Sequence, residues 1–167
     1  KKLMNKVNFN SKILKRHNEK FKTKKFNNNN TVIKNDYIIL LGSFKKSNNE
    51  KNIKIKEIVN YLRKKNIIKY SIQTYDIGIG NALLCSIFHC NNISGIKIYI
   101  NSSNSIEDLL FNDKYSNHIL FLSEKYIFDV QKYSNVKKIS CLTIGKVTSQ
   151  NYLIINDGLV DLDINKL

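Results

Sequence analysis

Apolar and polar residues follow one another in blocks that predict strands and helices from Asp36 onward. The segment from Asp36 to Gly42 is a continuous apolar run closed by glycine, the form of a buried strand. Between Ile53 and Lys65, apolar residues recur at helical spacing, at Ile55, Ile58, Val59 and Leu62. A buried strand followed by an amphipathic helix is typical of a sheet covered by helices.

The rest of the chain repeats this alternation. Further strands are predicted at 69–75, 95–100, 118–122 and 140–147, with a last short pair at 152–155 and 159–162. Further helices are predicted at 81–89, 106–111 and 124–133. The predicted fold class is therefore α+β, a mixed α/β arrangement in which one mixed β-sheet is covered mainly by three helices.

Length and cysteine content restrict the class of protein. A chain of 167 residues fits one domain and can bury a core without disulfides. The sequence has no signal-peptide core and no run approaching the roughly 20 apolar residues of a membrane span, so we expect a cytoplasmic protein without a membrane partner. Cys85, Cys90 and Cys141 show no zinc-like spacing and are expected to be reduced core thiols. A metal site at Cys85, His89 and Cys90 is a weak alternative.

The net charge of +15 is unevenly distributed. Residues 1–35 contain eleven Lys or Arg and one Glu, a net charge of +10, which leaves +5 for residues 36–167. We interpret residues 1–35 as a basic arm or the remnant of a preceding segment, and 36–167 as the domain. The excess of Lys and Asn and the absence of proline resemble the codon bias of an AT-rich genome, so the charge is weak evidence for a nucleic-acid partner.

A glycine turn between a predicted strand and a predicted helix presents one carboxylate, Asp76. The sequence continues as Ile-Gly-Ile-Gly, and residues without β-carbons let the backbone turn sharply and approach a ligand closely. Asp76 is thus either a metal-binding acid or a turn residue that hydrogen-bonds backbone amides. His118 heads a predicted strand and is interpreted as a surface or interface residue rather than a base.

Four segments, in sequence order, resemble the C-terminal-type domain of the aminoimidazole-ribonucleotide-synthetase superfamily. They are DYIILLG at 36–42, YDIGIGNALL at 75–84, LLFND at 109–113 and TIGKVTSQNYLIINDGLVDLDINKL at 143–167. Within the superfamily the chain is most similar to the phosphoribosylformylglycinamidine synthase (PurL) family, and more to its first half-repeat than to its second. The resemblance covers about residues 36–167.

This resemblance implies a function in purine biosynthesis, the ATP-dependent amidation of formylglycinamide ribonucleotide by a C–N ligase. It places Asp76 at the position of a magnesium-binding Asp, with Mg²⁺ as cofactor and ATP as co-substrate. It places Asp113, Lys114 and Tyr115 where a Glu-Ser-Gln triplet contacts the ribonucleotide, although Lys114 and Tyr115 depart from small or amide side chains. No residue matches the family's catalytic histidine. The implied partners are N-terminal-type nucleotide-binding domains and a glutaminase domain or subunit that supplies ammonia.

Two alternatives remain at this stage. Another enzyme of the superfamily, of the thiamine-monophosphate kinase or hydrogenase-maturation type, would share the fold, although the Gly-Glu-Asp-Tyr-Glu-Leu segment expected of the kinase is absent. A non-catalytic nucleic-acid-binding module would use the basic arm. The arm contains Phe9, Phe21 and Phe26 but no RNA-binding signature, which disfavours nucleic acid as the partner.

Overall fold

The computed structural model describes residues 31–44, 48–90, 92–101, 105–112, 114–115 and 117–166. Its strands are β1 (Tyr37–Leu41), β2 (Tyr70–Gln73), β3 (Gly95–Ile98), β4 (His118–Leu122), β5 (Cys141–Thr148), β6 (Tyr152–Ile155) and β7 (Val160–Asp163). Its helices are α2 (Asn49–Lys64), α3 (Gly78–His89), α4 (Ile106–Phe111) and α5 (Ile127–Val136), with short 3₁₀ turns η2 (Glu124–Tyr126) and η3 (Ile164–Lys166). None of the helices in these ranges has the length and apolar character needed to cross a bilayer.

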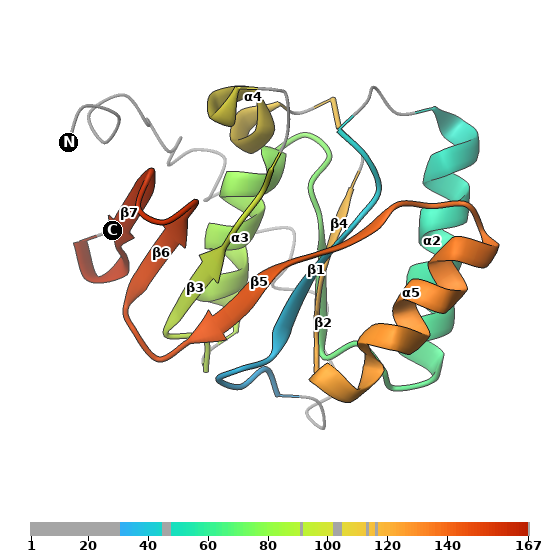
Figure 1. The fold of residues 1–167 in the computed structure, drawn as a ribbon, viewed down its shortest axis with the longest axis horizontal. Coiled ribbons are helices and arrows are strands. Elements are labelled where there is room, and N and C mark those ends of the chain that lie inside the picture. The colour runs from blue at the N-terminus through green and yellow to red at the C-terminus, as the bar shows by residue number, and fades with distance from the viewer. Residues whose placement is uncertain are drawn as a thin grey trace.

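The strands form one mixed, twisted sheet (Figure 1). Their spatial order is β2-β4-β1-β5-β3-β6-β7, and neighbours are antiparallel except for the parallel pair β3 and β6. Strand β1 therefore lies in the interior of the sheet, between β4 and β5, and β5 is the central strand. The predicted α+β class, with a mixed sheet covered by helices, is confirmed.

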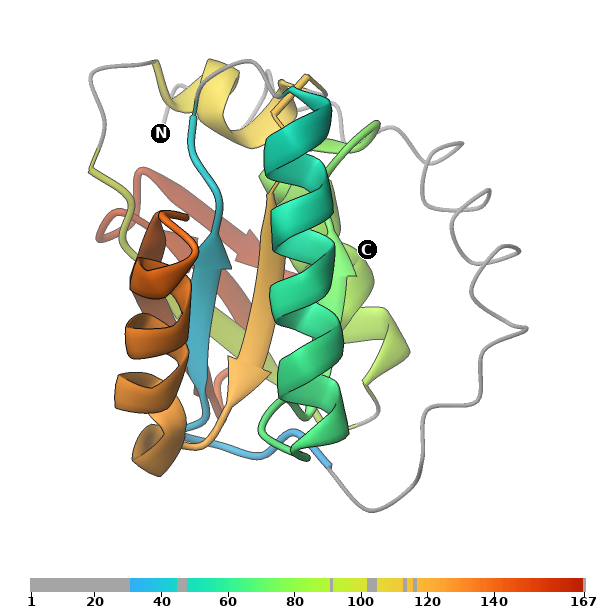
Figure 2. The same cartoon turned by 90° about the vertical axis from the view of Figure 1, so that its right-hand side faces the viewer.

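The two faces of the sheet carry separate cores. Successive side chains of a strand point to opposite faces, so Ile38 and Leu40 of β1 pack on the α3 side, whereas Ile39 and Leu41 pack under α2 and α5. Figure 2 shows α2 and α5 in front of the sheet and α3 behind it. Three helices supply most of the cover, as predicted, and the short α4 packs on α3.

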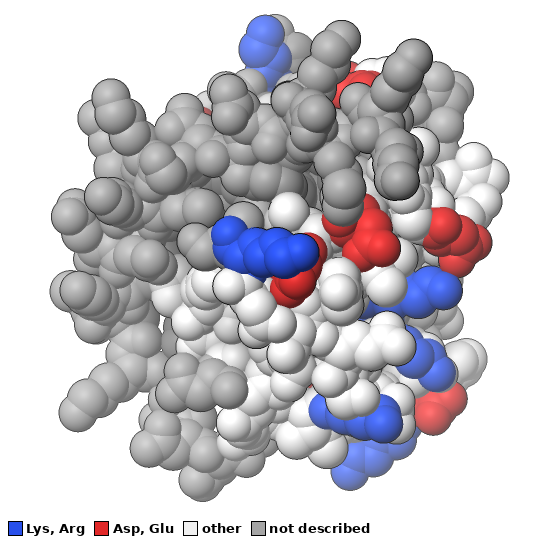
Figure 3. Space-filling view, turned by 90° about the vertical axis from the view of Figure 1, so that its left-hand side faces the viewer, with Lys and Arg blue, Asp and Glu red and all other residues white. Residues whose placement is uncertain are grey.

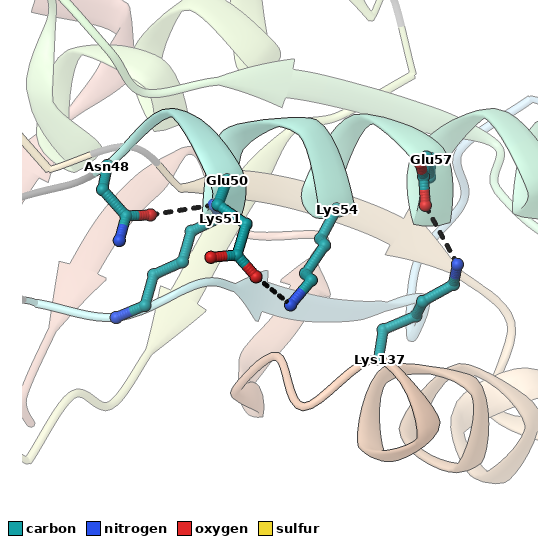
Figure 4. Close-up of polar contacts among 6 residues, drawn as sticks. All are labelled: Asn48, Glu50, Lys51, Lys54, Glu57 and Lys137. Carbon is teal, nitrogen blue, oxygen red and sulfur yellow. Dashed lines mark hydrogen bonds and ion pairs between the residues drawn. The ribbon is translucent and has the colours of Figure 1, made fainter.

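Helix α2 begins four residues before its predicted start because its first turn is polar and shows no apolar period. The side chain of Asn48 caps the helix by accepting a hydrogen bond of 2.9 Å from the Lys51 amide (Figure 4). Glu50 pairs with Lys54 one turn later, and Glu57 pairs at 2.9 Å with Lys137, just after α5. These exposed ion pairs contribute about 0–1 kcal/mol each.

Packed residues also lie before Asp36, the predicted start of the domain. Val32 is 3% exposed and belongs to the core on the α3 side, and the Asn35 amide donates to the Val147 carbonyl. Two apolar residues at 32–33 are too short a run to show a period. Residues 1–30, the main part of the predicted arm, lie outside the described residues.

Asp36 forms a buried ion pair at the start of β1. It is 3% exposed, its two carboxylate oxygens accept from Lys69 Nζ at 2.9 and 2.8 Å, and one also accepts from the Ile33 amide at 2.7 Å. The pair fixes the chain before β1 to the chain before β2.

We expect Asp36→Asn to lower the free energy of unfolding by about 3 kcal/mol, because the amide leaves the Lys69 ammonium without a counter-charge in a mostly buried position. Urea unfolding at pH 7 measures this loss. Glu57→Gln, which breaks the exposed pair with Lys137, is the matched control and should cost less than about 1 kcal/mol. Equal losses in the two variants would contradict a special role for the buried pair.

Candidate active site at the end of β2

Asp76 lies in the turn that leads from β2 into α3. Its backbone is left-handed, with φ of +69°, a conformation that Asp tolerates better than most residues. Its side chain is exposed and forms no hydrogen bond or ion pair with any residue that the structure describes. The residue before α3 is Ile77, and no side chain caps the helix there. The carboxylate is therefore not used for capping and faces solvent, as a metal-binding role requires; that role itself stays a prediction.

Gly78 and Gly80 have a packing role that the sequence did not suggest. A β-carbon on Gly78, whose φ is +76°, would lie 2.4 Å from the Leu110 carbonyl oxygen, and one on Gly80 would lie 3.3 Å from Leu110 Cβ. The missing β-carbons thus let α3 pack against α4. The positive φ of Gly78 agrees with the predicted sharp turn, and close approach of a ligand to the backbone stays a prediction. Helix α3 begins at Gly78 rather than at Asn81.

The segment before β4 lies directly beside the Asp76 turn. The Thr74 amide donates to the Asn117 carbonyl at 2.9 Å, and the Thr74 hydroxyl lies 3.1 Å from the Tyr115 carbonyl. The Asn117 amide donates in turn to the Thr74 hydroxyl at 3.1 Å. These bonds attach the segment with Tyr115, which is predicted to bind substrate, to Thr74, two residues before Asp76. Tyr115 and Asp76 themselves are 39 positions apart in the sequence.

The Tyr115 side chain is attached to α4. Its hydroxyl donates to Asp108 at 2.6 Å, and the amide of Asn112 donates to the other oxygen of the same carboxylate at 2.7 Å. The Lys114 side chain is exposed, while its backbone amide donates to Asn112 at 2.9 Å. Asp113, the remaining predicted substrate contact, lies outside the described residues.

Sequence reasoning did not identify Asp108 and Thr74, which hold the segment in place. The pattern Ser105-Ile-Glu-Asp108 is an N-capping signal, and the Ser105 hydroxyl accepts from the Asp108 amide at 3.1 Å. That signal predicts where α4 begins. It does not reveal that the Asp108 carboxylate accepts from Tyr115, because this contact depends on how the loop returns to the helix.

His118 is not suited to act as a base at neutral pH. It heads β4, as predicted, and is half-buried beneath α2. Burial, together with the nearby positive charges of Arg63 and Lys56, lowers its pKa to about 4. The imidazole is therefore neutral at pH 7 but too weak a base to accept a proton efficiently there.

This lowered pKa predicts a loss of stability in mild acid. The folded state resists protonation down to about pH 4, whereas a histidine in the unfolded chain binds a proton below about pH 6.5. The unfolded state thus gains protons first as the pH falls, and the free energy of unfolding should fall between pH 6.5 and 4 by about 1–3 kcal/mol. Urea unfolding of His118→Gln should lack this part of the decline. An identical pH profile for the variant and the wild type would contradict the prediction.

The cysteines do not form a metal site. Burial raises the pKa of Cys85 to about 11 and that of Cys90 to about 12, so both thiols stay protonated, and all three cysteines are free. No cluster of three or more His, Cys, Asp or Glu side chains that might hold a metal ion occurs within the described ranges. The alternative of a metal at Cys85, His89 and Cys90 is therefore not supported. The three thiols are free, as predicted, with Cys85 buried and Cys90 and Cys141 partly buried.

Comparison with known proteins gives a structural likeness without sequence similarity. No protein-family model matches the chain, and no curated protein sequence matches it. PurL of Thermotoga maritima complexed with ATP aligns at a TM-score of 0.69 and 7% identity, over 81% of this chain and 26% of that one. The same enzyme complexed with FGAR aligns at 0.68 and 5%, over 81% and 28%.

A chain of a HypE–HypF complex is also similar, at a TM-score of 0.55 and 14% identity, over 76% of this chain and 51% of that one. This chain spans about a quarter of the length of the PurL structures that it matches. At these identities the likeness concerns the fold alone. The chain has the aminoimidazole-ribonucleotide-synthetase-like fold that PurL contains.

Proposed function

We propose that this chain is one domain of an ATP-dependent enzyme of the aminoimidazole-ribonucleotide-synthetase superfamily, of the PurL type. Such an enzyme amidates formylglycinamide ribonucleotide (FGAR) in purine biosynthesis. The observation that carries the proposal is the likeness of 81% of the chain to PurL structures with ATP and with FGAR. The exposed, unpaired carboxylate of Asp76 at the end of β2 supports it.

The proposed chemistry assigns Asp76 a charge-neutralising role. In the reaction ATP phosphorylates the amide oxygen of FGAR, and ammonia then displaces the phosphate to leave an amidine. Phosphoryl transfer depends mostly on positioning and on neutralising negative charge, which Mg²⁺ supplies when bound. Proteins usually hold Mg²⁺ through one or two carboxylates together with substrate phosphates and water, so a single exposed Asp fits as one ligand.

The proposed substrate contacts lie on the segment beside Asp76. The exposed ammonium of Lys114 can attract the phosphate of the ribonucleotide, and Asp108 holds Tyr115 in position from α4. Asp113 belongs to the same proposed set. Because Thr74 ties this segment to the β2 turn, substrate and metal would meet at one end of the sheet.

The proposed activity needs further domains. The chain corresponds to about a quarter of PurL, and no residue in it matches the catalytic histidine implied by the resemblance. We propose that N-terminal-type nucleotide-binding domains supply the missing groups, that a glutaminase domain or subunit supplies ammonia, and that the assembly works in the cytoplasm. The lower TM-score with the HypE–HypF complex, 0.55 against 0.69, ranks a hydrogenase-maturation type of enzyme second.

Substrate dependence tests this proposal. The chain, purified from its own cells with the polypeptides that accompany it, should release ADP from ATP only when both FGAR and ammonium are present. Coupled detection of ADP measures the rate. ADP release that requires thiamine monophosphate instead would assign the chain to the kinase of the same superfamily.

A further inference from the structure

Half of one sheet face is left open. On the side covered by α2 and α5, the buried core includes β1 and β4 residues such as Ile39 and Leu120, but apart from the partly buried Cys141 no side chain of β5, β3, β6 or β7 belongs to it. Figure 1 shows β5, β3 and β6 at the front left, with α3 behind them and no described helix in front. This surface, called the open face below, is thus not covered by any helix that the structure describes.

Aromatic and basic side chains occupy the open face. The strand register places Tyr37, Lys146, Lys97 and Ile154 in one row across β1, β5, β3 and β6. Lys146 Nζ lies 4.2 Å from the centre of the Tyr37 ring. Tyr99, two residues after Lys97 and on the same face, is 59% exposed and is not stacked on another described ring. The face thus combines flat apolar surface with cations.

A groove of about 490 Å³ runs along this face between β3, β5 and the residues before β1. Its lining includes Lys34, Lys97, Lys146 and Tyr99, and no Asp or Glu. Lys97 pairs with Asp157 at 3.1 Å, but both side chains are more than half exposed, so an anionic ligand can compete for the lysine.

Acidic residues limit the positively charged surface at the β7 edge. Seen from the left-hand side of Figure 1, where β6 and β7 lie, blue and red side chains are interspersed (Figure 3). Strand β7 itself carries Asp161 and Asp163. Attraction for an anion is therefore greatest over β3 and β5.

We propose that the open face binds single-stranded nucleic acid, with Lys34, Lys97 and Lys146 on the phosphates and Tyr99 stacked on a base. Proteins that bind single strands combine a basic groove with aromatic side chains on which bases stack, and an exposed sheet face is a known platform for this. The proposal is independent of the enzymatic function proposed above.

Two observations favour this occupant over an acidic protein segment. Tyr99 gives a base a stacking surface, whereas an acidic peptide would use only the lysines. In addition, residues 1–30 contain ten Lys or Arg and one Glu, and this basic segment joins the described chain three residues before Lys34. Its positive charge adds to the sequence-independent attraction of the chain for phosphates. A face assembled from separate strands leaves no linear RNA-binding signature, so the lack of such a signature in the basic arm does not argue against this site.

Fluorescence anisotropy with the full chain and a labelled single-stranded RNA of about 12 nucleotides tests the proposal. We expect Tyr99→Ala to weaken binding about 10-fold, the effect of losing one stacked base, and Tyr99→Phe to bind as the wild type does. Lys146→Gln should reduce the slope of log K against log salt by about 0.7. Lys51→Gln, at an exposed position of α2 far from the groove, is the charge-matched control. It should change the slope less than Lys146→Gln does.

Two results would overturn the proposal. If Tyr99→Ala and Lys146→Gln bind as Lys51→Gln does, the affinity comes from the basic segment alone and the open face is not the site. If polyglutamate of equal charge displaces the RNA from the wild type as effectively as unlabelled RNA does, the face is a site for an acidic protein segment. Thermal unfolding of each variant verifies that it is folded.

Discussion

Replacing Gly78 with alanine is expected to destabilise the domain by about 3–5 kcal/mol. A side chain here is strained twice, because φ is +76° and because the new β-carbon would lie 2.4 Å from the Leu110 carbonyl oxygen and 2.9 Å from Phe111 Cα. Both neighbours are backbone atoms of α4 and cannot rotate away. Helix α4 would have to move, which would also disturb the contact between Asp108 and Tyr115.

Gly158 provides the matched control for this prediction. Its φ is +97°, also in the region that favours glycine, but a β-carbon there would have no neighbour within 4 Å. Gly158→Ala should therefore cost only the backbone strain, about 1 kcal/mol. Urea unfolding of both variants separates strain from steric overlap. Equal losses in Gly78→Ala and Gly158→Ala would show that contact with α4 is not the reason for glycine at position 78.

Local patterns in the sequence determined much of the fold. Strands β4 and β6 and helix α4 have their predicted bounds, at 118–122, 152–155 and 106–111. The two strands are short, mostly apolar runs with polar flanks, and α4 begins after the capping residue Ser105. The first turn of α2 is polar and shows no apolar period, so the sequence did not reveal that the helix begins at Asn49. The uncovered half of the sheet was not predictable, since it depends on which strands the helices happen to cover.

The candidate site was less accessible to sequence reasoning. Exposure of Asp76 agrees with its position in a glycine turn, but the glycines themselves proved to serve helix packing. Proximity of Tyr115 to Asp76 follows from the antiparallel pairing of β2 with β4 and the hydrogen bonds of Thr74. Only the family resemblance anticipated that these two segments lie together, because no spacing rule relates residues so far apart in the chain.

Asp76→Asn is expected to leave the fold intact and to lower the proposed ligase activity by about 100-fold, in the range that removal of one electrostatic group from an active site costs. The fold should survive because the side chain is exposed and unpaired, and because Asn adopts a φ of +69° as readily as Asp does. Activity should fall because a neutral amide is a poorer ligand for Mg²⁺ than a carboxylate. Thermal unfolding verifies the first expectation.

Asp157→Asn is the control that matches this change most closely. Asp157 is also exposed and also has a positive φ, of +54°, but it lies in the turn between β6 and β7. Asp157→Asn makes the same chemical change at a residue that also has a left-handed backbone, but away from the β2 turn. The ligase activity should therefore be unaffected.

The most direct test of the proposed function is the Mg²⁺ dependence of ADP release that requires FGAR and ammonia, measured for the wild type, Asp76→Asn and Asp157→Asn in the assembled enzyme. We predict that Asp76→Asn alone loses about 100-fold in turnover at limiting Mg²⁺ and recovers part of it at high Mg²⁺. Turnover equal to that of the wild type at limiting Mg²⁺ would contradict the account and leave Asp76 as a residue of the turn.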